Sequence, residues 1–200
     1  MKDTLDSTKL KFSFLISGLL IVCIIFSLAF PDIAEACTAV YVGKDVSTDG
    51  QTIVARSVDA HPTNILFNTA VNPRVENQPG RIYKSVNSNF NYPLPDTTYQ
   101  YFSTPEDSCC GEGEFGSACT NEYGLAVSAT VSCYTQQAIL DLDPFNKDGI
   151  SEEVSASILC MCSKNAREAV ELAGKIVDEY GAENANSLVA ADQKEAWMME

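Results

Sequence analysis

The sequence predicts an α+β domain in which an antiparallel sheet is covered by helices. Two observations carry this prediction. Stretches that alternate polar and apolar residues occur in three pairs, each joined by a short turn, which is the pattern of a β-hairpin. Two stretches with helical spacing lie between the second and third pairs. Hairpins build antiparallel sheet, and helices grouped after them can cover one of its faces.

The first hairpin is predicted over residues 37–59. CTAVYVG at 37–43 alternates and is rich in β-branched residues, and QTIVARSVD at 51–59 has the character of a returning strand. Between them, KDVSTDG at 44–50 contains a Ser-Thr-Asp-Gly turn signal. With the turn centred there, paired residues have numbers that sum to about 97, within one or two for register.

This register brings three chemically active side chains to one end of the hairpin. It places Asp59 beside Cys37, with Arg56 a few residues further along the same strand. A surface ion pair between Arg56 and Asp59 is the simpler interpretation, and such a pair adds little stability. We favour a functional site, because the two residues accompany Cys37, which directly follows a predicted cleavage site.

Residues 60–108 are rich in Asn, Pro and Tyr, and are predicted to form long loops and short strands. The second hairpin is predicted over 113–132, with its turn at 121–124. Asn121 and Gly124 are expected to serve the backbone geometry of that turn.

Two helices are expected next. SEEVSASILCMC at 151–162 has an acidic first turn, which the helix dipole favours. NAREAVELAGKIVDEYG at 165–181 is the stronger pattern, since Asn165 can cap it, Glu168 completes a capping box and Gly181 provides a stop. Its apolar stripe should pack on the first hairpin or on neighbouring strands.

The third hairpin is predicted from NSLVAAD at 186–192 and KEAWMME at 194–200. Trp197, in the second of these strands, is expected to lie in the core.

The N-terminal segment has the features of an export signal. No charged residue occurs over 12–30, and Pro31 ends any helix there. Ala34 and Ala36 follow in the A-x-A spacing that a signal peptidase recognises, which predicts cleavage between Ala36 and Cys37.

Residues 1–36 are therefore predicted to be a signal peptide, and 37–200 the exported domain, extracellular or in the cell envelope. The apolar run of 12–30 could also just span a bilayer, so a retained membrane anchor is the alternative. Acylation of Cys37 as a lipoprotein is disfavoured, because Ala34 and Glu35 do not fit the usual pattern before the cysteine.

The net charge of −14 excludes nucleic acid and anionic lipid surfaces as partners, since both would be repelled. Contact with a membrane is expected only through the N-terminal segment. The field of such a protein favours neutral or cationic small ligands.

Six cysteines follow Cys37, an even number that permits disulfides in an exported chain. They are Cys109, Cys110, Cys119, Cys133, Cys160 and Cys162. A zinc site is disfavoured, because there is no C-x-x-C motif and the only histidine is His61, which we expect in a solvated loop. No metal and no cofactor are predicted.

A cysteine that begins a mature chain carries a thiol and a free α-amine. The amine of a chain terminus has a pKa of about 7.7–8.0, so it is a base poised near neutrality. One residue can then supply both nucleophile and general base, and no histidine is needed.

The motifs of the first hairpin resemble those of the PepD-like cysteine dipeptidases, which group with the secernins in the N-terminal nucleophile (Ntn) hydrolase superfamily. The matching residues are Cys37-Thr38, Gly43, the turn Ser47-Thr48-Asp49-Gly50 and Arg56-Ser57-Val58-Asp59. The resemblance continues, in order, at 120–130 and at 186–200.

The resemblance implies a four-layer αββα sandwich. Members of this kind are longer, so the chain is expected to hold the N-terminal part of the domain, truncated before the second half of the sandwich. It also implies hydrolysis of short peptides with a free amino end. In the related bile-salt hydrolases an oxyanion-hole asparagine follows the second turn, where this chain reads SATVS. The oxyanion donors of this chain therefore stay open.

Chemistry and resemblance together assign three catalytic roles. The sulfur of Cys37 attacks the carbonyl, and its α-amine carries the proton. Asp59 orients that amine, and Arg56 stabilises the thiolate or binds a carbonyl or carboxylate of the substrate.

Two alternatives remain at this level. One is an amidase similar to bile-salt or penicillin hydrolases. The other is a non-catalytic, membrane-anchored and disulfide-stabilised extracellular module, in which Cys37 stays internal to the chain. Cys109-Cys110 and the pair Cys160 and Cys162 are expected in disulfides or in the core in either case.

Overall fold

The computed structural model describes residues 37–58, 69–85, 88–105, 116–131 and 133–200. The predicted leader 1–36, Asp59, His61 and the pair Cys109-Cys110 lie outside these ranges. Within them, none of the helices has the length and apolar character needed to cross a membrane.

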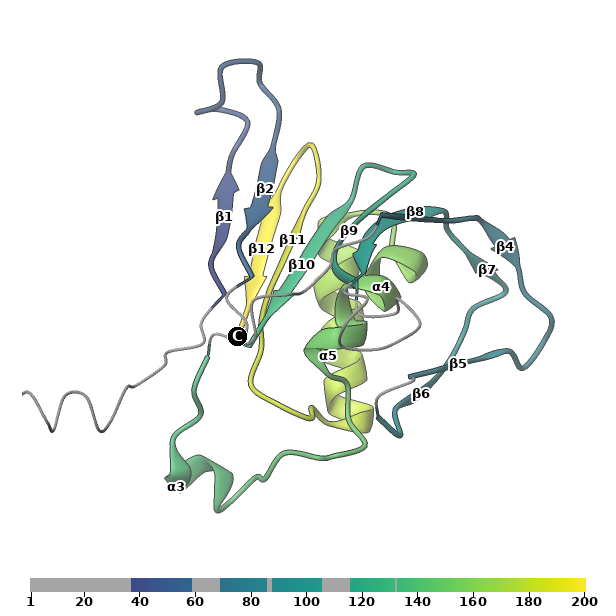
Figure 1. The fold of residues 1–200 in the computed structure, drawn as a ribbon, viewed down its shortest axis with the longest axis vertical. Helices are drawn as coiled ribbons and strands as arrows, with labels where there is room; N and C mark the ends of the chain where they lie inside the picture. Colours follow the sequence, from purple (N-terminus) through teal and green to yellow (C-terminus); the bar gives the residue numbers. More distant parts are fainter. Residues whose placement is uncertain (1–36, 59–68, 86–87, 106–115, 132) are drawn as a thin grey trace, which may run out of the picture. The chain divides into compact units, whose positions relative to one another are not determined.

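A six-stranded sheet forms the centre of the fold, and every neighbouring pair of its strands is antiparallel (Figure 1). In spatial order the strands are β12 (Ala196–Met199), β11 (Ser187–Ala191), β10 (Ala126–Thr130), β9 (Gly116–Asn121), β8 (Tyr101–Pro105) and β3 (Ala70–Asn72). The second and third predicted hairpins are confirmed as β9–β10 and β11–β12. The α+β class is confirmed with them.

The region predicted as loops and short strands supplies β3 and β8 to this sheet. It also forms two small antiparallel pairs, which are β4 (Val75–Glu76) with β7 (Thr97–Thr98) and β5 (Ile82–Lys84) with β6 (Asn91–Pro93).

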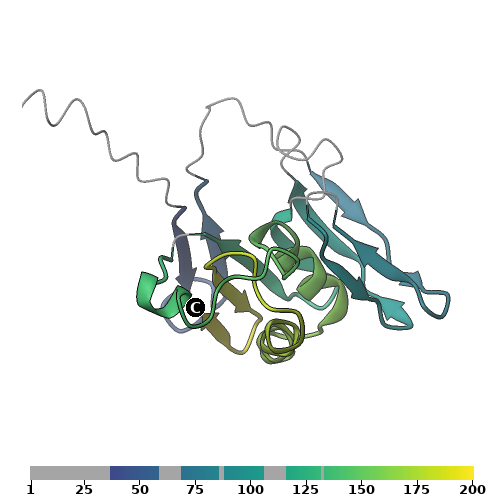
Figure 2. The ribbon, with the colours of Figure 1, turned by 90° about the horizontal axis from the view of Figure 1, so that it is seen from below.

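The first predicted hairpin is also present, as β1 (Ala39–Val42) and β2 (Ile53–Arg56). Ala39 pairs with Arg56 and Val42 with Ile53, so the paired numbers sum to 95, two below the predicted centre. The hairpin makes a two-stranded sheet of its own, and is not part of the larger one. It lies on one side of the six-stranded sheet and the helices lie on the other (Figure 2).

Three helices are described, α3 (Gln137–Leu140), α4 (Glu152–Cys162) and α5 (Ala166–Tyr180). The sequence analysis anticipated α4 and α5 but not the single turn of α3. The predicted cap of α5 is present, because the Asn165 side chain accepts a hydrogen bond from the Glu168 N–H at 2.9 Å. The Glu168 carboxylate reaches the N–H of Lys164, one residue before the cap. Gly181 follows with a φ of 77°, a conformation that glycine adopts readily.

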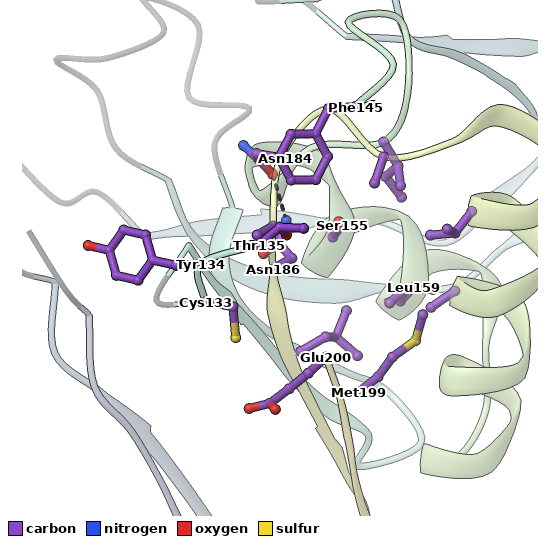
Figure 3. Close-up of a pocket in the computed structure, with 16 residues that line it drawn as sticks. Cys133, Tyr134, Thr135, Phe145, Ser155, Leu159, Asn184, Asn186, Met199 and Glu200 are labelled. Carbon is purple, nitrogen blue, oxygen red and sulfur yellow. Dashed lines mark hydrogen bonds between the residues drawn. The ribbon is translucent and has the colours of Figure 1, made fainter. Parts of the chain in front are cut away.

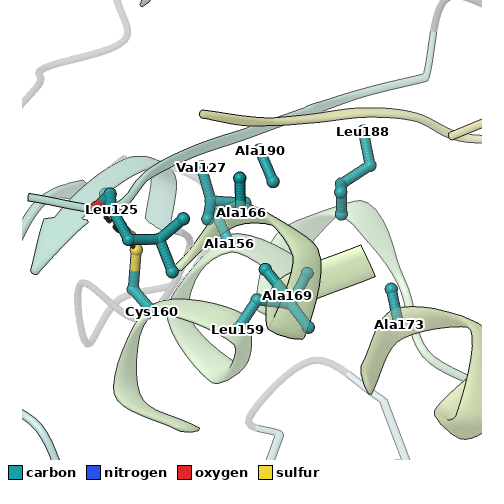
Figure 4. Close-up of a cluster of buried hydrophobic side chains, with 11 residues drawn as sticks. Leu125, Val127, Ala156, Leu159, Cys160, Ala166, Ala169, Ala173, Leu188 and Ala190 are labelled. Carbon is teal, nitrogen blue, oxygen red and sulfur yellow. Dashed lines mark hydrogen bonds between the residues drawn. The ribbon is translucent and has the colours of Figure 1, made fainter. Parts of the chain in front are cut away.

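Helices α4 and α5 pack on the sheet through small side chains (Figure 4). Leu125, Val127, Leu188 and Ala190 of the sheet region meet Ala156, Leu159, Cys160, Ala166, Ala169 and Ala173 of the helices. The alanines let the helix backbones approach the strands closely, and excluding apolar surface from water stabilises the contact. Helix α5 lies against β11 and β12 of the six-stranded sheet. The first hairpin is a separate sheet, so the expected packing of α5 on that hairpin or on strands paired with it is not observed.

The placement of Trp197 in the core was wrong. Trp197 is 36% exposed, and the guanidinium of Arg167 lies 4.5 Å from the centroid of its ring. The reason is its strand. β12 is the edge strand of the sheet, and there the ring lies against the guanidinium of Arg167 in α5 instead of entering the core.

The described cysteines after Cys37 do not form disulfides with one another; Cys119, Cys133, Cys160 and Cys162 carry free thiols. Cys160 is fully buried in the helix–sheet core, which agrees with the core alternative. Burial raises the pKa of the Cys162 thiol to about 12, and raises the pKa of Cys160 as well.

Asn121 does more than shape the turn before β10. Its carboxamide oxygen accepts the N–H groups of Tyr123 and Leu125, at 3.0 and 3.1 Å. Its nitrogen donates to the carbonyls of Cys160 and Ser163 at the end of α4, at 2.9 and 2.7 Å. Asn121 is buried, and its one side chain satisfies four backbone groups.

Replacing Asn121 by Ala should lower the free energy of unfolding by roughly 2–4 kcal/mol, because buried backbone groups lose their partners. Urea denaturation followed by circular dichroism measures the change. The matched control is Asn77→Ala, which removes two exposed hydrogen bonds, one donated to the Pro95 carbonyl and one accepted from Arg81, and should change stability by less than about 0.5 kcal/mol. Equal effects of the two variants would contradict this role.

Candidate active site

Cys37 lies at the open end of the first hairpin, two residues before β1. The hairpin continues past its paired strands, because the Ser57 N–H donates to the Thr38 carbonyl at 2.8 Å and the Thr38 N–H donates to Ser57 Oγ at 3.2 Å. These two bonds fix the backbone next to Cys37. The position of the sulfur is thus set by the register of the hairpin.

Arg56 is brought to Cys37, as predicted. It ends β2 opposite Ala39, and its Nη2 lies 3.4 Å from Cys37 Sγ. Its Nη1 donates to the carbonyl of Ala129 in β10. Only 7% of the arginine side chain is exposed, so this cation lies inside the fold beside the sulfur.

In the part of the chain that the structure describes, the carboxylate paired with this buried cation is that of Glu152. Its Oε1 lies 3.4 Å from Arg56 Nη2, and its side chain is 8% exposed. Glu152 is the first residue of α4, where the helix dipole favours negative charge. The acidic first turn of this helix was recognised from the sequence, but Glu152 was not assigned to the site. An acidic residue at the start of a largely apolar helix is the pattern that could have identified it.

Asn186 joins the same structure. With its amide oriented to satisfy both neighbours, its oxygen accepts the Glu152 N–H at 3.0 Å and its nitrogen donates to the Thr130 carbonyl at 3.1 Å. It therefore links the N-terminus of α4 to the end of β10.

Two of the predicted site residues lie outside the described part of the chain. These are Asp59, assigned to orient the amine, and Ala36, assigned to the cleavage site. Their roles stay predictions.

A cavity of about 540 Å³ opens beside Cys37, between the hairpin and the face of the sheet away from the helices. Its lining residues from the hairpin side are Cys37, Thr38, Ala39 and Tyr41, and those from the sheet side are Thr130, Cys133, Ser187, Val189, Ala196, Trp197, Met198 and Glu200. Three of these lining residues, Cys133, Ser187 and Glu200, were not predicted to belong to the site. Nothing in their local pattern marks them, because strands far apart in sequence bring them to Cys37.

Hydrogen bonds connect these three residues. Ser187 Oγ lies 2.9 Å from Cys133 Sγ, and it donates to Glu200 Oε1 at 3.2 Å. A second, mainly apolar cavity of about 470 Å³ adjoins the first and shares Cys133 and Glu200 with it (Figure 3). The described residues include no cluster of three His, Cys, Asp or Glu side chains that could hold a metal ion.

A cysteine beside a buried arginine, at the start of a hairpin and in a cavity, is the arrangement that the resemblance implied. The profile described as "Peptidase family C69" matches residues 36–200. The chain belongs to peptidase family C69.

Curated members of this family have similar sequences. "Probable dipeptidase B" of Streptococcus pyogenes serotype M1 is 36% identical over 183 residues, which are 92% of this chain and 36% of that protein. "Probable dipeptidase" of Latilactobacillus sakei is 35% identical over 170 residues, or 83% of this chain and 35% of that protein. "Probable dipeptidase A" of S. pyogenes serotype M1 is 34% identical over 165 residues, or 82% and 34%.

The C69 chain thus spans about a third of the length of these relatives. The family recognised from the first hairpin is confirmed.

The buried pair of the C69 site should be strongly coupled. Arg56→Met should lower the free energy of unfolding by roughly 3–5 kcal/mol, since it leaves the Glu152 carboxylate buried without its cation. The double variant Arg56→Met/Glu152→Gln should recover much of that loss. Denaturation of the wild type, both single variants and the double variant measures the coupling.

The control is the same cycle on Arg167 and Glu195, whose Nη2 and Oε2 lie 3.2 Å apart with 54% and 36% of the side chains exposed. That pair should show a coupling of about 1 kcal/mol or less. A coupling of Arg56 with Glu152 no larger than this would contradict the analysis.

Proposed function

We propose that the protein is a cysteine-type dipeptidase that hydrolyses short peptides, with Cys37 as nucleophile. The observation that carries the proposal is the 3.4 Å approach of the buried Arg56 guanidinium to Cys37 Sγ within a cavity. A cation held beside the sulfur stabilises negative charge as it develops there. The names of the C69 relatives support the substrate class.

The proposed mechanism begins with removal of residues 1–36, which leaves a free α-amine on Cys37. That amine takes the thiol proton while the sulfur attacks the scissile carbonyl. It then passes the proton to the departing amine, which leaves a thioester. Water attacks the thioester, the α-amine takes a proton from the water, and the sulfur departs and regains that proton. Asp59 holds the amine in position during both steps.

The architecture fits this chemistry. In the proposed sandwich, β1–β2 begins the second sheet of an αββα fold, and the six-stranded sheet with α4 and α5 forms the other two layers. The nucleophile then lies between the two sheets at one end. The leader takes the chain out of the cytoplasm before cleavage, or keeps it at the membrane through 12–30 if it is retained.

Cys37→Ala should abolish dipeptide hydrolysis by the protein that lacks residues 1–36, a fall of at least about 10³-fold. Cys37→Ser should leave little activity, because a hydroxyl is much harder to deprotonate than a thiol. Cys162→Ala is the matched control, since it removes a thiol that burial keeps protonated outside the cavity, and it should retain activity. Release of amino acids from a dipeptide measures all three. Substantial activity in Cys37→Ala would exclude this nucleophile.

Removal of residues 1–36 should be as necessary for dipeptide hydrolysis as the sulfur of Cys37. The full-length protein is assayed with and without residues 1–36, and intact mass identifies the first residue of each preparation. Only the form that begins with Cys37 should hydrolyse dipeptides, since a peptide bond to Ala36 removes the basic amine. Equal activity from the form that retains the leader would end the N-terminal mechanism.

A further inference from the structure

The cavity beside Cys37 contains a charged group that the mechanism above does not use. We infer that the carboxylate of Glu200 is a subsite for the free α-ammonium group of the substrate. The inference deepens the proposed function and rests on it. It assigns the specificity for short peptides with a free amino end to one residue.

The charge of the cavity supports this assignment. Among the described residues that line it, Glu200 has the one formally charged side chain, and Lys and Arg do not occur. The Arg56 cation lies beside Cys37 but is balanced by Glu152. The remaining walls are mainly apolar or uncharged, as for Val189 and Met198. Glu200 is exposed, so a cation can reach its carboxylate from solvent, and the described lining residues supply no competing cation.

Glu200 is held in place and is still accessible. Ser187, which is 8% exposed on β11, donates to Glu200 Oε1 at 3.2 Å. The other carboxylate oxygen accepts no hydrogen bond from the described residues, so it can receive a ligand N–H. In Figure 3 the carboxylate of Glu200 points away from both Leu159 and Phe145. A positioned carboxylate with one open oxygen is suited to an ammonium group.

The covalent structure of a dipeptide requires this proximity. The ammonium nitrogen is separated from the scissile carbonyl carbon by two bonds, of about 1.46 and 1.52 Å. A group that binds the ammonium must therefore line the same cavity as the nucleophile. Cys37 and Glu200 do so although 163 positions separate them in the sequence. A longer peptide bound at its interior would bring no ammonium to this position.

The test compares two substrates with the same scissile bond, Ala-Ala and N-acetyl-Ala-Ala. The wild-type protein that begins with Cys37 should strongly prefer the free amine. Glu200→Gln should lower kcat/KM for Ala-Ala by roughly 10- to 100-fold, mainly through KM, and leave the acetylated substrate unchanged. The control Glu195→Gln makes the same change in charge on the same hairpin, outside the cavity, and should behave as wild type.

Three outcomes would overturn the subsite. Glu200→Gln could leave Ala-Ala hydrolysis unchanged, which would mean that the carboxylate does not contact the substrate. It could lower kcat for both substrates equally, which would place Glu200 on the catalytic amine of Cys37 instead. The wild type could also fail to distinguish the two substrates.

A measurement on the wild-type protein guards against a variant that fails to fold. Alaninamide should protect Cys37 from alkylation by iodoacetamide at least about 10-fold better than N-acetyl-alaninamide. Equal protection would contradict the subsite. The protection measurement does not require the protein to hydrolyse a substrate. A protein that hydrolyses no dipeptide but shows selective protection would refute the proposed function and keep the subsite.

Discussion

The burial of Arg56 is the constraint on which the site depends. A guanidinium with 7% of its side chain exposed must be paired, since an unpaired charge in the interior is strongly unfavourable. Among the described residues, partners come from three parts of the fold: Cys37 before β1, Ala129 in β10 and Glu152 at the start of α4. Satisfying one cation therefore fixes the hairpin, the sheet and the helix against one another. The sulfur takes its position from that arrangement.

Much of the fold could be predicted because its signals are local. Alternation and turn residues gave all three hairpins, and the Asn165 cap with Gly181 gave both ends of α5. The pairing of Arg56 with Cys37 followed from the hairpin register, which is also a local property. The prediction for Trp197 was wrong because its exposure depends on which strand forms the edge of the sheet, and a strand pattern alone does not contain that information.

The remaining site residues could not be predicted, because their positions depend on contacts between elements that are far apart in the sequence. Glu152, Ser187 and Glu200 have ordinary neighbours in sequence, and they acquire their roles only when α4, β11 and β12 meet the hairpin. Even Asn121, recognised as a turn residue, gains two of its hydrogen bonds from a helix that ends about 40 positions later. Contacts over such separations are a property of the tertiary structure. The cysteines illustrate the difference, since burial makes Cys160 and Cys162 poor nucleophiles whereas Cys37 and Cys133 line a cavity.

The cavity is built from both extremes of the described chain, and this has a consequence for timing. The β1–β2 hairpin joins residues close in sequence and can form early, whereas β12 can pair only after everything before it has been synthesised. A growing chain therefore presents Cys37 long before the wall that contains Glu200 exists. The order of synthesis alone therefore delays formation of the cavity beside Cys37. A growing chain that has not yet reached β12 carries the cysteine without that cavity.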